Sequence, residues 1–164
     1  MLRFETLSDR HDRSRFTSGQ ADLDEYLARF AKQNEKRSYS RTFVMVEGDD
    51  PRVIGYYTLS AGGVIFENLP DEVRRKLPRY PMPVAHLGRM AVDKDFQGRG
   101  YGALLLLDAL KRALAVSADM AIAGVEVRAK SPSVKAFYAR YGFIELLDDH
   151  LHMYLPIDTI RALS

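Results

Sequence analysis

Three glycines, Gly98, Gly100 and Gly102, alternate at the start of a long leucine-rich segment, and no other feature of the sequence restricts the fold as strongly. Residues 84–92 before them predict a strand, and residues 100–116 predict a helix. Glycine has no β-carbon, so the backbone can turn sharply here and approach a ligand closely. The helix start offers unpaired N–H groups and the positive end of its dipole. This loop therefore predicts a site for a diphosphate.

Several interpretations of the glycine loop compete. A P-loop needs Lys-Ser or Lys-Thr after the glycines, and the sequence has neither. A dinucleotide fingerprint fits the spacing of Gly98, Gly100 and Ala103, but its first glycine should end the strand, and other residues intervene here. The pattern Gln-x-x-Gly-x-Gly is matched in full by Gln97, Gly100 and Gly102. A glycine-rich turn without a ligand is the remaining alternative.

Strand-like and helix-like segments interleave on both sides of this loop. Strands are expected at residues 2–7, 41–47, 53–59, 84–92, 121–128 and 151–155. Helices are expected at residues 21–33, from Leu69 in a short basic segment with Pro70 in its first turn, at residues 100–116, from Ser131 and Pro132 to Gly142, and after Pro156. An extended connector carries Pro78, Pro81 and Pro83. The pattern predicts an α/β or α+β protein with one mixed sheet, as a single domain over residues 1–164.

The sequence argues against several classes of chemistry and location. Cysteine is absent, so disulfides, thiolate metal sites and an acyl-cysteine intermediate are excluded. His150 and His152 have the spacing to share a strand face, but no third ligand lies nearby, so no metal site is expected. No segment has the length and apolar character of a membrane span or a signal peptide, so we expect a cytoplasmic protein without membrane contact.

Two stretches of the chain concentrate basic residues, although the net charge is only +2. The first contains Arg29, Lys32, Lys36, Arg37 and Arg41, opposed by Glu35 alone, and the second contains Arg74, Arg75, Lys76, Arg79 and Arg89 with no acid between them. A positive face suits a polyanionic partner, and an ordinary solvated surface is the alternative. The sequence leaves both interpretations open.

The loop from Gln97 to Gly102 resembles motif A of the GNAT superfamily of N-acetyltransferases, and the segment Phe137–Phe143 is similar to its F-Y-x-x-x-G-F motif. The resemblance implies a GNAT fold, in which helices flank a mixed sheet, and direct transfer of an acetyl group from acetyl-CoA. It implies that the backbone of Met90, Ala91 and Val92 pairs with the pantetheine arm. It further implies that the pyrophosphate is bound by the N–H groups of Gln97, Gly98, Arg99, Gly100, Tyr101 and Gly102.

By the same resemblance, Tyr138 is the expected general acid, and a backbone N–H near Met90 is the expected oxyanion donor. A tyrosine, with a reference pKa of about 10, is protonated at neutral pH and can hydrogen-bond a departing thiolate of pKa about 8.5. Tyr141 is a rival, because it lies three residues along the same expected helix. No convincing general base is apparent, and His86 is conceivable. An α-amine, with a pKa near about 8, needs less help from a base than lysine does.

The resemblance covers nearly the whole chain when the GNAT toxins of type II toxin–antitoxin systems, the TacT/AtaT-like toxins, are considered. It is carried by Phe16–Gly19, Leu23–Leu27, Gln33–Asn34, Gly55–Ser60, Leu77–Pro83 and Leu87–Asp93. It implies a toxin that acetylates the α-amine of aminoacyl-tRNA and blocks translation, a homodimer, and neutralisation by a ribbon-helix-helix antitoxin. The expected tRNA contacts are Arg29, Lys32, Lys36, Arg37, Arg79 and Arg89. Antitoxin contact or plain surface charge is the alternative for each.

Two other functions stay open for this sequence. A GNAT enzyme of the same fold could acetylate a small amine or a protein N-terminus without any tRNA. A chain of a different class could bind coenzyme A without catalysis, or serve mainly to assemble a repressor complex.

Overall fold

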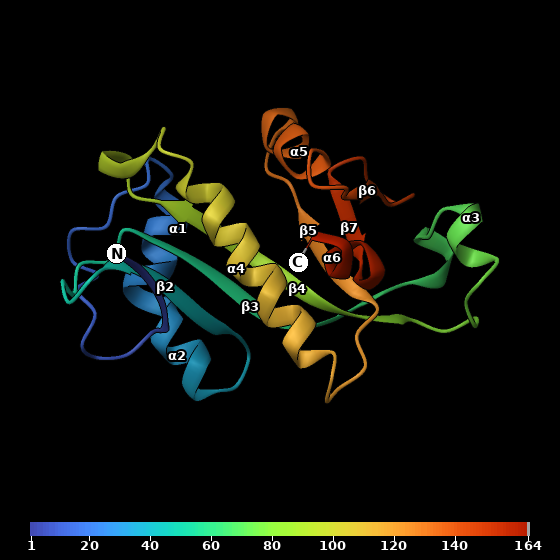
Figure 1. Cartoon of the computed structure of the whole chain (residues 1–164), viewed down its shortest axis with the longest axis horizontal. Coiled ribbons are helices and arrows are strands. Elements are labelled where there is room, and N and C mark those ends of the chain that lie inside the picture. Colours follow the sequence, from blue (N-terminus) through green and yellow to red (C-terminus); the bar gives the residue numbers. More distant parts are fainter. Residues whose placement is uncertain (164) are drawn as a thin grey trace. The chain divides into compact units, whose positions relative to one another are not determined.

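The computed structural model describes residues 1–163. Its strands form one mixed sheet flanked by helices, in the order β1-β2-β3-β4-β5-β7-β6, which confirms the expected fold class (Figure 1). The strands are β1 (Leu2–Thr6), β2 (Arg41–Glu47), β3 (Gly55–Val64), β4 (Met82–Val92), β5 (Gly124–Arg128), β6 (Ile144–Glu145) and β7 (His152–Pro156).

The helices account for most of the remaining regular structure. The α-helices are α1 (Ala21–Glu25), α2 (Ala31–Lys36), α3 (Asp71–Arg74), α4 (Tyr101–Val116), α5 (Pro132–Ala139) and α6 (Ile157–Leu163). The π-helical segment η1 (Tyr26–Phe30) joins α1 to α2, and η2 (Phe66–Asn68) and η3 (Lys94–Phe96) are single 3-10 turns. Within residues 1–163, none of these helices combines the length and the apolar character of a membrane span.

Contacts divide the chain into two compact units, which are described separately below. Unit 1 comprises Met1–Ser60 and Leu87–Ala109, and unit 2 comprises Ala61–His86 and Leu110–Ser164. The expectation of a single domain over residues 1–164 stays a prediction.

Unit 1 contains the antiparallel strands β1 and β2 and the first part of β3, and the helical stretch of α1, η1 and α2 packs on them. β1 pairs with β2 in the register Phe4↔Met45, and β2 pairs with β3 in the register Phe43↔Tyr57. Apolar residues recur at helical spacing in α1, η1 and α2, which gives this stretch one apolar face. That face joins a core of Leu23, Tyr26, Leu27, Ala31, Val44, Val46, Val53, Tyr56 and Ala91. The core fixes the base from which the glycine loop departs.

Unit 2 is organised around β5 and β7, which pair antiparallel in the register Glu126↔Tyr154. Gly124 at the start of β5 is required by close packing, because a β-carbon there would lie 2.2 Å from the Leu155 carbonyl oxygen. The next helix, α5, begins as expected: the Ser131 hydroxyl accepts a hydrogen bond from the Val134 N–H, and Pro132 follows the cap. This start fixes the position of the helix that carries Tyr138.

The observed boundaries correct the expected ones at several places. Residues 53–54 precede β3, because the Val53 N–H bonds to the Asp12 carbonyl rather than continuing a strand pair. β3 then runs on to Val64. Pro83 belongs to β4 and not to a connector, since its carbonyl accepts the Ala123 N–H and its missing N–H is not needed there.

Further differences lie at shorter elements. The first helical stretch extends to Lys36, β5 begins at Gly124, and Pro70 occupies the cap position before α3 rather than its first turn. The short strand β6 pairs with β7 and was not expected, because two residues give no periodicity to detect.

Candidate active site

The glycine loop has the geometry that a bound diphosphate requires. Gly98 and Gly100 have φ angles of +79° and +80°, a region that side chains with a β-carbon rarely adopt. A β-carbon added at Gly98, Gly100 or Gly102 would meet no atom within 4 Å, so the space over each of these residues is open. The loop leads directly into α4, and the first N–H that bonds back is that of Leu104, to the Gly100 carbonyl. The N–H groups of residues 98–103 before it are left for a ligand.

The side chains of Asp93 and Gln97 stabilise the conformation of this loop through hydrogen bonds to the backbone. Asp93 is buried, and its carboxylate accepts hydrogen bonds from the N–H groups of Thr17 (3.0 Å) and Asp95 (2.9 Å). The Gln97 side-chain amide donates to the carbonyl oxygens of Ser18 (2.8 Å) and Val92 (2.9 Å). The Gln97 side chain therefore holds the loop in shape, and the Gln97 backbone N–H bonds back to the Lys94 carbonyl at 3.5 Å. Asp93 was missed, because nothing in the sequence distinguishes it from a solvated acid.

Replacing Gln97 by alanine is therefore expected to weaken acetyl-CoA binding by about 5- to 10-fold, since each hydrogen bond contributes about 0.5–1.5 kcal/mol to the loop. Gln97→Glu should weaken binding more, because a carboxylate cannot donate to two carbonyls and would also repel the diphosphate. Titration calorimetry measures both variants. Gln20→Ala is the control, since the Gln20 side chain makes no capping hydrogen bond. Unchanged affinity in Gln97→Glu would contradict the bracing role.

Cationic side chains surround an aromatic ring at the start of the loop. The guanidinium carbons of Arg52 and Arg99 lie 5.1 Å and 5.2 Å from the centre of the Phe96 ring. Arg52 also forms ion pairs with Asp95 at 3.0 Å and with Asp93 at 3.4 Å. Arg99 is exposed and carries its charge beside the glycines, which suits the phosphate role expected of it. Arg52 was missed, because it lies far from the motif in sequence.

The end of β4 contains the three residues expected to pair with the pantetheine arm. Met90 and Val92 are half-buried, and the Ala91 side chain is buried in the core of unit 1. The Ala91 carbonyl faces Gly55, and the Val92 carbonyl already accepts from Gln97. Their pairing with an added ligand strand stays a prediction.

Tyr138 lies in α5 in unit 2, between two other aromatic rings. Its ring centre is 5.3 Å from that of Phe137 and 5.2 Å from that of Phe143. Burial raises the pKa of the Tyr138 phenol to about 12. No hydrogen bond involves the Tyr138 hydroxyl within residues 1–163. This hydroxyl is also not one of the buried side-chain polar atoms without a partner, which among these residues are Thr42 Oγ1 and Arg52 Nε. The hydroxyl therefore keeps some contact with solvent while its ring is packed, as a proton donor in a site requires.

Tyr141 does not share the helix of its rival. α5 ends at Ala139, and Tyr141 follows in the turn that closes with Gly142 at φ +98°. Its ring packs beside Phe137 at 5.5 Å. The expectation that both tyrosines lie on one helix was wrong, because α5 ends at Ala139, two residues before Tyr141.

Unit 2 also contains a buried hydrogen-bond network that the sequence did not indicate. His86 Nδ1 lies 2.9 Å from Glu126 Oε1, and His152 Nε2 lies 2.5 Å from Glu126 Oε2. His152 Nδ1 lies 2.9 Å from Asp148 Oδ1. His150 stands apart from this network, exposed and outside β7, so the expected common strand face of His150 and His152 was wrong. The signal was absent because the network joins residues from three distant segments.

The expected tRNA contacts in unit 1 lie on the helical stretch and on β4. Arg29 forms an ion pair with Glu25 (3.6 Å), and Lys32 forms one with Asp9 (2.8 Å). Both acids lie outside the basic stretch, in which Glu35 is the only opposing charge. Lys36 and Arg37 are exposed. The Arg89 guanidinium lies 3.7 Å from the centre of the Tyr26 ring, a stacking contact that fixes its orientation.

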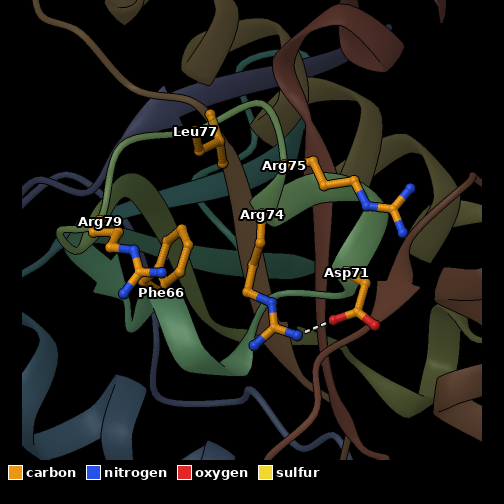
Figure 2. Close-up of a pocket in the computed structure, with 6 residues that line it drawn as sticks. All are labelled: Phe66, Asp71, Arg74, Arg75, Leu77 and Arg79. Carbon is orange, nitrogen blue, oxygen red and sulfur yellow. Dashed lines mark hydrogen bonds and ion pairs between the residues drawn. The ribbon is translucent and has the colours of Figure 1, made fainter.

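Arg79 belongs to unit 2, where it lines a pocket of about 340 Å³ together with two more arginines. Figure 2 shows the lining residues Phe66, Asp71, Arg74, Arg75, Leu77 and Arg79. Arg79 stacks over Phe66 at 5.9 Å, and Arg74 forms an ion pair with Asp71. Three guanidinium groups and one carboxylate leave a positive pocket, whose charge suits a phosphate.

Comparison with known proteins gives agreement over nearly the full length. The sequence profile of the Acetyltransferase (GNAT) family matches residues 4–143. A tRNA-acetylating toxin of Mycobacterium tuberculosis is 38% identical over 157 residues, which cover 96% of this chain and 93% of the relative. A probable toxin TacT of Sinorhizobium fredii is 32% identical over 163 residues, with 94% and 90% covered.

Solved structures match the fold of this chain over nearly its full length. A tyrosine-to-phenylalanine mutant of KacT matches with a TM-score of 0.93 at 31% identity, covering 99% of both chains. AtaT complexed with acetyl-methionyl-tRNAfMet matches with a TM-score of 0.92 at 28% identity, covering 99% of both. A tyrosine-to-phenylalanine mutant of AtaT, bound to the C-terminus of the antitoxin AtaR and to acetyl-CoA, gives a TM-score of 0.83 at 26% identity, covering 99% and 97%.

Proposed function

Because this chain belongs to the acetyltransferase (GNAT) family and is related to tRNA-acetylating toxins, we propose that it acetylates the α-amine of aminoacyl-tRNA and thereby blocks translation. The observation that carries the proposal is 38% identity to a tRNA-acetylating toxin over 96% of this chain. The open glycine loop and the partly solvated Tyr138 hydroxyl support the chemistry.

In this proposal acetyl-CoA supplies the acetyl group as a thioester, and the chain's residues bind and orient it. The N–H groups of residues 97–102 bind the diphosphate, and the backbone of residues 90–92 pairs with the pantetheine arm. The neutral amine nitrogen attacks the acetyl carbon, so that a C–N bond forms as the C–S bond breaks. The sulfur leaves as a thiolate, and the proton that the nitrogen loses passes to solvent. Tyr138 holds the proton that stabilises the departing sulfur. With a pKa of about 12, its hydroxyl contributes more through a hydrogen bond than through full proton transfer.

The basic residues and the relatives together support the choice of acceptor and partners. Arg89, held on Tyr26, and the pocket around Arg79 offer guanidinium groups to a phosphate backbone. AtaT has been solved with an acetylated aminoacyl-tRNA and with the C-terminus of its antitoxin AtaR. We extend both to this chain: an aminoacyl-tRNA substrate, and a ribbon-helix-helix antitoxin that binds a homodimer.

Cell-free translation tests the toxin activity. Adding the protein with acetyl-CoA is expected to stop synthesis, whereas adding either alone should not. A GNAT enzyme acting on a small amine or a protein N-terminus would release coenzyme A from acetyl-CoA with its own acceptor and leave translation running. A non-catalytic module would bind coenzyme A without releasing any thiol.

Replacing Arg79 by glutamine should weaken tRNA binding by about 3- to 10-fold. The cause is the loss of one phosphate contact, which also lowers the slope of log affinity against log salt by about one. Fluorescence anisotropy over a salt series gives both quantities. Arg161→Gln is a suitable control in the same unit, because Arg161 pairs with Asp158 on the surface. An unchanged salt slope for Arg79→Gln would remove Arg79 from the interface.

A further inference from the structure

The segment between β3 and β4 forms the positive pocket of unit 2 that Figure 2 shows. Here it is called the arginine pocket, and its lining residues are Phe66, Asp71, Arg74, Arg75, Leu77 and Arg79. Leu69 in this segment is fully buried, and the Asn68 carbonyl accepts a hydrogen bond from the Leu147 N–H at 2.7 Å. Phe66 and Leu77 pack against the buried cluster that contains Leu69. The core of unit 2 therefore fixes the apolar wall of the pocket.

The arginine pocket carries more positive than negative charge. Asp71 supplies its carboxylate, which forms an ion pair with Arg74. Arg75 and Arg79 are exposed, and neither forms an ion pair within residues 1–163. The Arg79 guanidinium lies over the Phe66 ring at 5.9 Å, which keeps it at the pocket while its N–H groups can still donate to a ligand. Three arginines against one aspartate give the lining a net charge of +2.

A phosphate monoester matches this charge. It carries about −1.5 to −2 at pH 7 and has three terminal oxygens that accept hydrogen bonds. Guanidinium groups bind such oxygens in bidentate pairs, so one phosphate can bridge two arginines. A phosphodiester of a nucleic-acid backbone carries about one negative charge, and a carboxylate has its two oxygens in one plane. A single monoester therefore neutralises the lining, whereas a single diester or carboxylate does not.

The arginine pocket also has room for more than a phosphate group. Its volume of about 340 Å³ lies within the range of about 300–1,000 Å³ that small-molecule sites occupy. The half-buried Phe66 and Leu77 place apolar surface beside the charges. A phosphorylated sugar satisfies both features, because its phosphate meets the arginines while its ring carbons contact the apolar wall. The pocket therefore favours a ribose monophosphate over inorganic phosphate.

A mature tRNA carries such a group at its 5′-end, whereas its internal phosphates are diesters. The 5′-terminal nucleotide belongs to the acceptor stem, beside the 3′-end that bears the amino acid. A protein that reacts with the aminoacyl group therefore meets the 5′-terminal phosphate at the same end of the tRNA. The arginine pocket and Tyr138, the expected acid, belong to one unit, so this unit has groups suited to both termini of the acceptor stem.

We propose that the arginine pocket binds the 5′-terminal phosphate monoester of the aminoacyl-tRNA, with Arg75 and Arg79 as the phosphate ligands. The inference rests on the proposed function and names the part of the substrate that this pocket recognises. No bond is made or broken at this site. The contact aligns the acceptor end and selects tRNAs whose 5′-end has been processed to a monophosphate.

Two forms of one tRNA test the site, one with its 5′-phosphate and one converted to the 5′-hydroxyl by a phosphatase. Fluorescence anisotropy should show that the wild-type protein binds the phosphorylated form about 10-fold more tightly, the lower end of what a charged hydrogen bond contributes, because both arginines are exposed. Its slope of log affinity against log salt should be steeper by about one. In Arg75→Gln and in Arg79→Gln the preference should fall to about 2-fold or less.

The kinetics of acetyl transfer give a second readout. The 5′-hydroxyl form of the aminoacyl-tRNA should raise KM and leave kcat unchanged, because the contact is the same in the ground state and in the transition state. Lys76→Gln is the matched control, since it removes one charge at the residue next to Arg75. Lys76 lines a different pocket, together with Glu72 and Asp158, and its variant should keep the 10-fold preference of the wild-type protein.

Several results would overturn the proposal. Equal wild-type affinities for the two tRNA forms would do so, and so would a preference that survives in both arginine variants. If the tRNA forms bind equally while Arg75→Gln loses binding of adenosine 5′-monophosphate or of an oligoglutamate peptide, the pocket serves a free nucleotide or an acidic protein instead. Failure of the wild-type protein to acetylate either form would reject the proposed function, whereas equal KM values for both forms would reject this site alone.

Discussion

Tyr138→Phe should lose about 100- to 1,000-fold in the turnover of acetyl-CoA while keeping its affinity for the cofactor, because removal of one positioned proton donor typically costs this much. The hydroxyl has no hydrogen-bond partner among residues 1–163, and its ring packs between Phe137 and Phe143. Its removal should therefore change the free energy of unfolding by less than about 1 kcal/mol. Turnover is measured by thiol release with aminoacyl-tRNA, and affinity by calorimetry.

Tyr141→Phe is the matched control. Tyr141 lies in the turn after α5, and its described aromatic contact is the packing of its ring against Phe137. It should retain the wild-type rate. Undiminished turnover in Tyr138→Phe, or an equal loss in both variants, would reject Tyr138 as the acid.

Gly100→Val is expected to weaken acetyl-CoA binding by about 100-fold, which corresponds to about 2.7 kcal/mol. Two effects act together. A β-branched residue at φ +80° strains the loop by about 1–2 kcal/mol. Its side chain also fills the open space over the N–H groups, each of which contributes about 1.5–3 kcal/mol to a charged ligand.

Gly48→Val supplies a control of similar backbone strain. Gly48 has φ +55°, and an added β-carbon there also meets nothing within 4 Å, but it lies in the hairpin between β2 and β3. Both variants should lose comparable stability in thermal unfolding, and only Gly100→Val should lose cofactor affinity by calorimetry. Equal affinities in the two variants would show that the loop is not the diphosphate site.

The fold was predictable where one local signal decides each element. The run of β-branched and aromatic residues within Arg41–Glu47 predicted β2 with its observed bounds, and Ser131 with Pro132 predicted the start of α5. Regions where tertiary pairing decides were not predictable. Val53 bonds to Asp12, and Pro83 pairs with Ala123, and neither partner can be recognised from a neighbouring residue.

The same distinction between local sequence signals and tertiary contacts applies to the candidate site. Gln97, the glycines and Tyr138 were indicated because they lie in contiguous motifs, and their roles stay predictions. Asp93, Arg52 and the network of His86, Glu126, His152 and Asp148 were missed. These residues act through contacts between segments far apart in sequence, for which periodicity and spacing give no signal.

Mass analysis of charged tRNA tests the central claim most directly. Purified protein is incubated with acetyl-CoA and a mixture of aminoacyl-tRNAs, and the amino acids are then released and weighed. The account predicts that one or more of them carry a single acetyl group on the α-amine, and that Tyr138→Phe leaves them unmodified. Amino acids that remain unacetylated with the wild-type protein, while thiol is released with another amine, would contradict it.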